Sequence, residues 1–111
     1  SGDAVLKQVA SILKKNSRTS DIACRYGGEE MSIILTNTSK QDAITTAQKV
    51  CLAVRNNKFI LTEGQKVNVT ISVGVATVGE NGEKPQEMIE YADKCLYKAK
   101  ESGRNQVVYD V

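Results

Sequence analysis

Two adjacent acids, Glu29 and Glu30, follow a Gly27-Gly28 pair between two apolar runs at residues 22–24 and 31–35. The runs have the character of β-strands, and two glycines between strands predict a tight hairpin, because glycine adopts positive φ at little steric cost. Glycines also let a ligand come close to the backbone. Carboxylate oxygens suit a hard ion such as Mg²⁺. The stretch therefore predicts a metal-nucleotide site at a hairpin, with a solvated acidic turn as the alternative.

Hydrophobic spacing predicts the elements that position these acids. Asp3 is a plausible N-cap for a first helix, whose apolar positions are Val5, Leu6, Val9, Ala10, Ile12 and Leu13. The hairpin follows over residues 22–36. Ser39 with Asp42 begins a second helix. The apolar face of that helix comprises Ala43, Ala47, Val50, Cys51 and Val54.

The second half of the chain continues with strands and one more helix. Residues 58–78 predict two strands around Glu63-Gly64, and the alternation in residues 67–75 has the period of a half-buried strand. Pro85 suits the first turn of the last helix and Gly103 its C-terminal end. The apolar positions of that helix are Met88, Ile89, Ala92, Cys95, Leu96 and Ala99. A short strand at 106–109 completes the order α-β-β-α-β-β-α-β, which indicates an α+β sheet with helices on its faces.

Composition excludes several classes of protein. A length of 111 residues predicts one domain, and a net charge of +2 without a basic, aromatic-rich run argues against a nucleic-acid partner. No apolar stretch is long enough to be a membrane segment. The absence of histidine excludes His-dependent triads. Widely spaced Cys24, Cys51 and Cys95 predict small core residues in a reducing, cytoplasmic compartment.

The motif Arg25-Tyr26-Gly27-Gly28-Glu29-Glu30-Met31 resembles that of the GGDEF family of diguanylate cyclases. The resemblance covers essentially the whole chain, since it also includes Gly2-Asp3-x-Val5-Leu6, Ile71-Ser72-Val73-Gly74-Val75-Ala76 and Ala92-Asp93-x-x-Leu96-Tyr97-x-Ala99-Lys100-x-x-Gly103-Arg104-Asn105. It implies an enzyme that condenses two GTP molecules into cyclic di-GMP, a bacterial second messenger. It also implies an α+β fold like the polymerase palm and nucleotide cyclases, with an antiparallel-rich sheet, a ferredoxin-like core and flanking helices.

The resemblance implies roles for the hairpin residues. Glu29 would bind the catalytic Mg²⁺ (or Mn²⁺) and help deprotonate the attacking 3′-hydroxyl, while Glu30 would support the metal site. The alternative for Glu30 is an exposed acid on a strand. Gly27 and Gly28 would let the nucleotide lie against the backbone.

Residues outside the hairpin would hold the rest of the nucleotide. Lys100 and Arg104 match residues that hold the GTP phosphates, although cations near a helix C-terminus also favour its dipole. Asp3 matches an aspartate that hydrogen-bonds guanine, which favours GTP over ATP.

A second, inhibitory site is implied five residues before the glycine pair. Arg18 and Asp21 match the Arg-x-x-Asp that binds a cyclic di-GMP dimer, and Lys49 falls near a second basic contact of some members. A loop ion pair is the alternative for Arg18 and Asp21.

The sequence departs from the family pattern in two places. Met31 replaces the usual Phe of the motif. We expect only a mild effect on packing, because the flexible Met side chain can fill irregular spaces in a core. The family's first strand, with its metal-binding Asp, lies upstream of Asp3, so residues 1–111 are expected to be a single partial domain with little or no activity alone. Because that strand is central in the family's sheet, the chain is expected to pair with another copy or rearrange.

Three functions are compatible with these observations. The first is a cyclase that acts as a homodimer, because each domain holds one GTP, within a protein that carries an upstream sensor or receiver domain. The second is a non-catalytic receptor that binds cyclic di-GMP through Arg18 and Asp21. The third is a scaffold that only dimerises a larger sensor.

Overall fold

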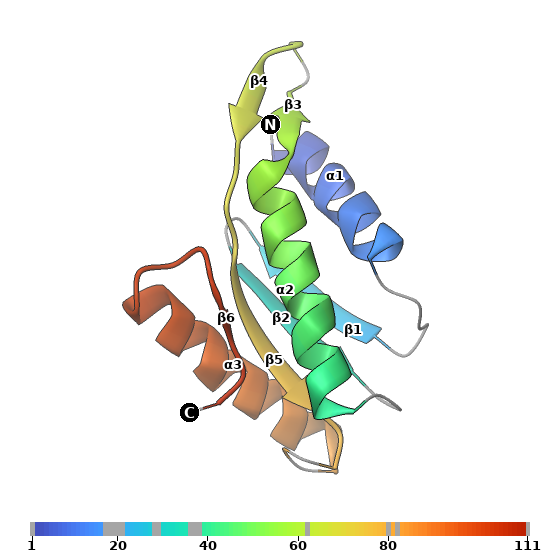
Figure 1. The fold of residues 1–111 in the computed structure, drawn as a ribbon, viewed down its shortest axis with the longest axis vertical. Coiled ribbons are helices and arrows are strands. Elements are labelled where there is room, and N and C mark those ends of the chain that lie inside the picture. Colours follow the sequence, from blue (N-terminus) through green and yellow to red (C-terminus); the bar gives the residue numbers. More distant parts are fainter. Residues whose placement is uncertain are drawn as a thin grey trace.

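The computed structural model describes residues 2–16, 22–27, 30–35, 39–61, 63–79, 81 and 83–110. Within these ranges the elements run in the order α1 (Gly2–Lys15), β1 (Ile22–Gly27), β2 (Glu30–Leu35), α2 (Lys40–Asn56), β3 (Lys58–Ile60), β4 (Lys66–Asn68), β5 (Ser72–Thr77), α3 (Pro85–Glu101) and β6 (Val107–Val108) (Figure 1). The predicted α+β class is confirmed.

The main sheet has the strand order β1-β2-β5-β6, and β3 and β4 form a separate hairpin. β1 and β2 are antiparallel, with Gly27 opposite Glu30, whereas β2–β5 and β5–β6 are parallel. The antiparallel-rich prediction is therefore corrected, because the described strands form two antiparallel and two parallel pairs. β2 pairs directly with β5 along its whole length, from Glu30 opposite Ser72 to Leu35 opposite Thr77.

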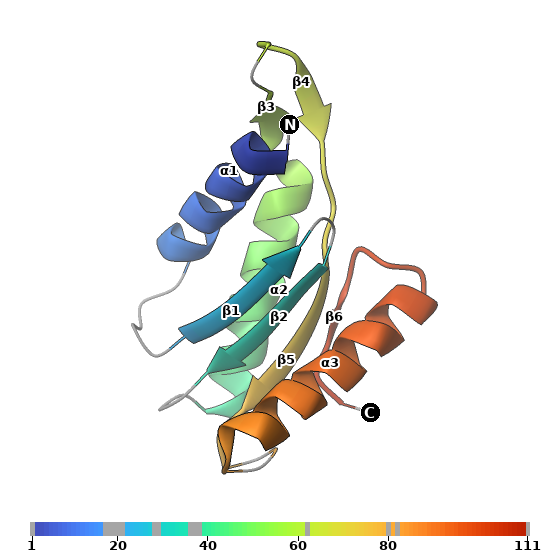
Figure 2. The ribbon, with the colours of Figure 1, turned by 180° about the vertical axis from the view of Figure 1, so that it is seen from behind.

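Helices cover both faces of the main sheet. α1 and α2 lie on one face and α3 lies on the other (Figures 1 and 2). Val73 and Val75 of β5 belong to the larger core cluster with α2, while Ala76 packs with Met88 and Ala92 of α3. The prediction of a half-buried strand is thus wrong for β5, which is buried throughout because both faces are covered.

The segment at 58–78 contains three strands rather than the two predicted, because the chain changes partners along it. Phe59 of β3 pairs with Val67 of β4, but Val73 of β5 pairs with Met31 on one side and Val107 on the other. The Gln8 side chain joins α1 to the β3–β4 hairpin through two hydrogen bonds. Its Nε2 donates to the Ile60 carbonyl (2.8 Å), and its Oε1 accepts from the Ile60 N–H (3.1 Å).

Local signals set most helix ends. Ser39 Oγ accepts a hydrogen bond from the Asp42 N–H (3.2 Å), which confirms the predicted start of α2. Pro85 opens α3 as predicted, and Glu87 Oε1 accepts from the Lys84 N–H (3.1 Å). The predicted N-cap at Asp3 is wrong, since α1 begins at Gly2 and Asp3 lies in its first turn.

The predicted buried positions are mostly confirmed. The apolar face predicted for α2 is buried, and Met31 is buried as expected. Ile89 is the exception on α3: it is 42% exposed, because it lies at the margin of the apolar stripe where the sheet does not cover it. None of the helices in the described ranges is both long and apolar enough to cross a membrane.

Candidate functional site

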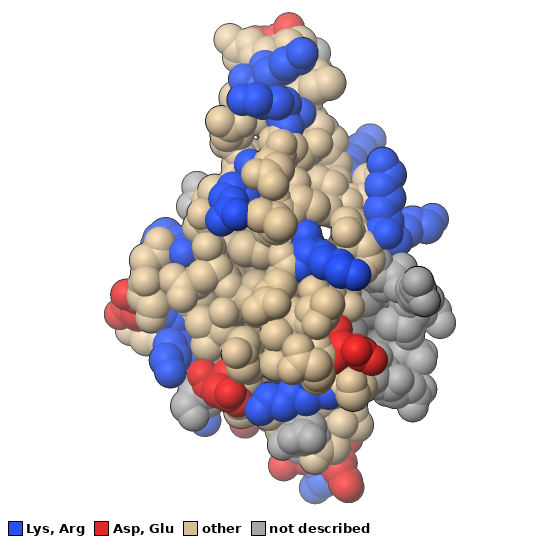
Figure 3. Space-filling view, viewed as in Figure 1, with Lys and Arg blue, Asp and Glu red and all other residues tan. Residues whose placement is uncertain are grey.

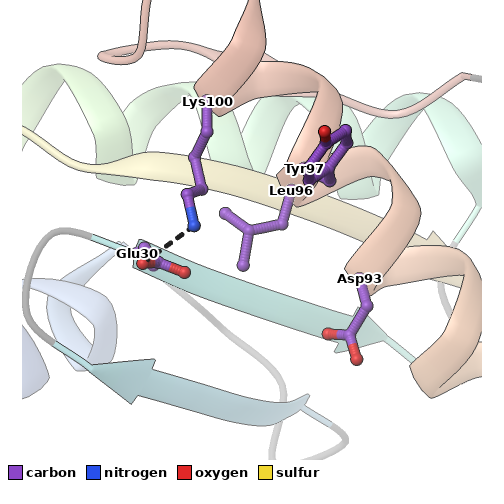
Figure 4. A pocket seen from close by; sticks show the side chains of 5 residues that line it. All are labelled: Glu30, Asp93, Leu96, Tyr97 and Lys100. Carbon is purple, nitrogen blue, oxygen red and sulfur yellow. Dashed lines mark ion pairs between the residues drawn. The ribbon is translucent and has the colours of Figure 1, made fainter.

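An ion pair joins the start of β2 to the end of α3. Glu30 Oε2 lies 3.1 Å from Lys100 Nζ, and the two side chains are 41% and 29% exposed. They line an open pocket of about 230 Å³ together with Asp93, Leu96 and Tyr97 (Figure 4). Two residues 70 positions apart, both predicted to serve the nucleotide, therefore meet in one pocket.

Helix geometry places the α3 residues of the pocket on one side. Asp93, Leu96, Tyr97 and Lys100 are spaced by three, four and seven residues, so they share one face of the helix. Glu30 and Ser32 are two residues apart on β2, so their side chains lie on the same face of the strand. This face is the one toward α3, because Ser32 contacts Asp93. The pocket is thus formed where one helix face crosses one strand face.

Gly74 allows α3 to lie this close to the sheet. A Cβ at this position would collide with the Ala92 carbonyl oxygen and the Leu96 backbone nitrogen of α3. Its neighbours on the same face of β5, Ser72 and Ala76, are also small. The close approach brings the Lys100 ammonium within reach of the Glu30 carboxylate.

Asp93 lines the pocket, although no role was predicted for it from the sequence. Ser32 Oγ donates a hydrogen bond to Asp93 Oδ1 (3.2 Å), which joins β2 to α3 a second time. The seven-residue spacing between Asp93 and Lys100 could have identified it as a residue on the same helix face.

A left-handed turn follows α3. Gly103 has φ +115 and ends the helix as predicted, while Arg104 and Asn105 also have positive φ, at 63° and 47°. The Arg104 N–H donates to the Ala99 carbonyl (2.9 Å), and Gln106 Nε2 donates to the Arg104 carbonyl (3.1 Å). The backbone of Arg104 is therefore held on both sides, although Arg104 does not line the pocket of Glu30 and Lys100.

Several predicted site residues lie partly or wholly outside the described part of the chain. Gly28, Glu29, Arg18 and Asp21 fall outside the described residues. Gly27 ends β1 opposite Glu30. Asp3 is placed in α1 by its backbone alone.

Lys49 lies away from the pocket. It is exposed on α2, which covers the other face of the sheet from α3. Figure 3 shows lysine and arginine side chains dispersed over the face that α2 covers. The predicted inhibitory contact and the Glu30–Lys100 pocket are thus on different layers of the molecule.

The described residues offer one part of a metal site. Glu30 supplies hard carboxylate oxygen at the pocket, the donor type that Mg²⁺ or Mn²⁺ prefers. Ser72, directly opposite Glu30 in the parallel ladder, carries a buried hydroxyl without a hydrogen-bond partner among the described residues. No group of three His, Cys, Asp or Glu residues able to hold a metal occurs in the described ranges. The donor chemistry fits a divalent ion at Glu30 only with further ligands.

The cysteines and tyrosines divide between core and surface. Cys51 and Cys95 are free and buried, as predicted. Burial raises the pKa of the Cys95 thiol to about 11, and the Asp110 carboxylate adds to this increase. Tyr91 donates its hydroxyl hydrogen bond to the Tyr109 carbonyl (3.0 Å), as a packing residue with a polar tip. Tyr97 is 64% exposed at the pocket rim, and its hydrogen bond to Glu101 raises its pKa.

Residues 1–106 match the family described as "Diguanylate cyclase, GGDEF domain". The chain belongs to the GGDEF family. This family is generally metal-dependent. A similar curated protein is diguanylate cyclase A of Treponema denticola, 44% identical over 106 residues that make up 96% of this chain and 28% of that protein. The response regulator PleD of Caulobacter vibrioides is 41% identical over 108 residues, or 96% of this chain and 24% of PleD. The chain thus spans about a quarter of the length of these relatives.

Solved GGDEF structures share the fold. The diguanylate cyclase SiaD of Pseudomonas aeruginosa, solved in complex with its activator SiaC, matches with a TM-score of 0.76 and 32% identity over 99% of this chain and 42% of SiaD. The GGDEF domain of YfiN from the same organism matches with a TM-score of 0.81 over 98% of this chain and 68% of that domain, at 23% identity. The predicted resemblance to the GGDEF family and the predicted α+β fold class are confirmed.

Proposed function

We propose that this GGDEF chain is part of a domain that condenses two GTP molecules into cyclic di-GMP in bacterial signalling. The observation that carries the proposal is the Glu30–Lys100 pair, which puts a carboxylate and an ammonium 3.1 Å apart at an open pocket. A carboxylate suits the cation that accompanies a nucleotide, and an ammonium suits its phosphates. Family membership and this juxtaposition support the same chemistry.

Lys100 would bind phosphate oxygen of the bound GTP, with Arg104 beyond the end of α3 as a second cation. In the nucleotide-bound state the Lys100 ammonium would turn from Glu30 toward phosphate. Glu30 would then be available, with Glu29, to hold Mg²⁺ or Mn²⁺. A bound divalent ion supplies charge stabilisation for in-line phosphoryl transfer. Gly27 and Gly28 would border the nucleotide, and Asp3 would accept hydrogen bonds from guanine.

The reaction needs two such sites, since one product molecule contains two nucleotides. We therefore propose that the active species is a homodimer, and that a sensor or receiver domain in the whole protein controls how the two sites meet. The whole protein is proposed to act in the cytoplasm, where GTP is available.

Turnover of GTP by the whole protein tests the proposal. With Mg²⁺ and GTP, wild type is expected to form cyclic di-GMP and pyrophosphate. Lys100→Met should lower kcat/KM by about 10- to 150-fold, if the lost charged hydrogen bond contributes about 1.5–3 kcal/mol. Lys98→Met is the matched control, because Lys98 is exposed on the same helix and does not line the pocket. Equal activity in the Lys100 and Lys98 variants would contradict the proposal.

The receptor function stays a prediction, in which Arg18 and Asp21, with Lys49, bind cyclic di-GMP without turnover. Cyclic di-GMP binding that is lost in Arg18→Ala, in a protein without GTP turnover, would favour it over the cyclase. Absence of binding to either nucleotide would favour a scaffold.

A further inference from the structure

We propose that Ser32 and Asp93 form a positioning pair that sets the height of α3 over β2, and so keeps Glu30 and Lys100 within reach of one nucleotide. The inference rests on the proposed function for its activity readout. Neither residue is proposed to touch the reacting atoms.

Two contacts fix the position of α3 along β2. Ser32 lies two residues after Glu30 on the same face of β2, about 6.6 Å along the strand. Asp93 lies seven residues before Lys100 on α3, about 10.5 Å along the helix. Because Asp93 meets Ser32 and Lys100 meets Glu30, the helix runs antiparallel to the strand and is joined to it at two points. The long Lys100 side chain accommodates the difference between the two spacings (Figure 4).

The Ser32–Asp93 contact is more rigid than the Glu30–Lys100 pair. Ser32 is buried and its side chain is short, so the Ser32–Asp93 bond (3.2 Å) tolerates little movement. The Glu30–Lys100 pair is partly exposed and joins two long side chains, and such pairs contribute little to stability. The functional pair therefore depends on the Ser32–Asp93 bond and on the close contact at Gly74 for its spacing.

The Ser32–Asp93 hydrogen bond places polar side chains between the sheet and α3, where apolar side chains could also pack. The opposite face of the same strand is apolar, with Met31 and Ile33 in the larger core cluster. Apolar side chains at positions 32 and 93 would also fill the space. A hydrogen bond is directional, however, and so fixes the register between the helix and the strand.

The test compares Ser32→Ala, Asp93→Ala and Asp93→Asn in the whole protein, with Glu90→Gln as an exposed control on α3 that lies outside the pocket. Asparagine keeps an oxygen that accepts from Ser32 Oγ, whereas alanine does not. Ser32→Ala and Asp93→Ala should each lower kcat/KM about 10- to 100-fold through misplacement. Asp93→Asn should stay within about threefold of wild type, and the Ser32→Ala, Asp93→Ala double variant should be no worse than Asp93→Ala.

A second readout needs no nucleotide. Amide hydrogen exchange in residues 93–101 should accelerate at least about threefold in Ser32→Ala and Asp93→Ala but not in Asp93→Asn or Glu90→Gln. Unchanged exchange and activity in Ser32→Ala would overturn the positioning role, as would an Asp93→Asn variant as impaired as Asp93→Ala, since Asp93 would then act by its charge. If wild type lacks GTP turnover, the proposed function fails, while the exchange data still decide whether the pair positions α3.

Discussion

At the scale of single residues, the pocket contains two oppositely charged side chains, and each is proposed to have another task when a nucleotide is bound. Glu30 and Lys100 neutralise one another at 3.1 Å in the structure. A nucleotide phosphate and a divalent ion would separate them, one taking each partner. Under the proposed function, the protein's own ion pair would therefore compete with the ligand in the binding equilibrium.

This competition predicts an unusual effect of Glu30→Gln. Loss of the carboxylate frees Lys100, so binding of GTP without a divalent ion should tighten by up to about fivefold, because an exposed ion pair contributes about 0–1 kcal/mol. Turnover with Mg²⁺ should nevertheless fall, because Glu30 is proposed to support the metal. Titration of GTP with chelator present and turnover with Mg²⁺ measure the two effects, and weaker metal-free binding would argue against the competition.

The Cys95 thiol predicts a pH dependence of stability. Its pKa is raised from 9.0 to about 11, chiefly by burial. Between these values the unfolded chain releases the thiol proton and the folded chain retains it, so the free energy of unfolding falls as pH rises. The decline approaches ~2–3 kcal/mol by pH 11. Urea unfolding at pH 8 and pH 10.5 should show a smaller decline in Cys95→Ala than in wild type, and equal declines would refute it.

At the scale of elements, the site depends on how closely α3 lies on β5. Gly74→Ala would drive a methyl group into the α3 backbone at Ala92 and Leu96, and such overpacking costs ~1–3 kcal/mol. Ser72→Ala is the control on the same strand face, and it should be nearly neutral because the Ser72 hydroxyl has no partner among the described residues. Thermal unfolding of both variants measures the difference, and a Gly74→Ala variant as stable as wild type would show that α3 can shift without cost.

At the scale of the whole molecule, the proposed product contains two nucleotides, so its formation would require two sites to meet. Specific cyclase activity should therefore rise with protein concentration over about a hundredfold range, and then level off once the homodimer is saturated. Activity per mole that is independent of concentration, in a protein shown to be monomeric by light scattering, would exclude this arrangement.

Local sequence was sufficient for the elements that have local causes. The Ser39 cap, Pro85 and Gly103 marked helix ends, because capping and proline or glycine backbone preferences act within a few residues. The hairpin between β1 and β2 could also be predicted from its glycine pair, and the buried face of α2 from hydrophobic spacing. The family resemblance came from motifs in order along the chain.

Tertiary structure alone decided what depends on contacts between distant segments. Burial of β5 on both faces required helices from two separate parts of the chain, and the break between β4 and β5 required two different sets of strand partners. The meeting of Glu30 with Lys100, and of Ser32 with Asp93, depends on how closely α3 lies on the sheet at Gly74 of β5, the strand next to β2. Periodicity indicates which residues share one face of a helix or strand, but tertiary packing determines which other element that face contacts.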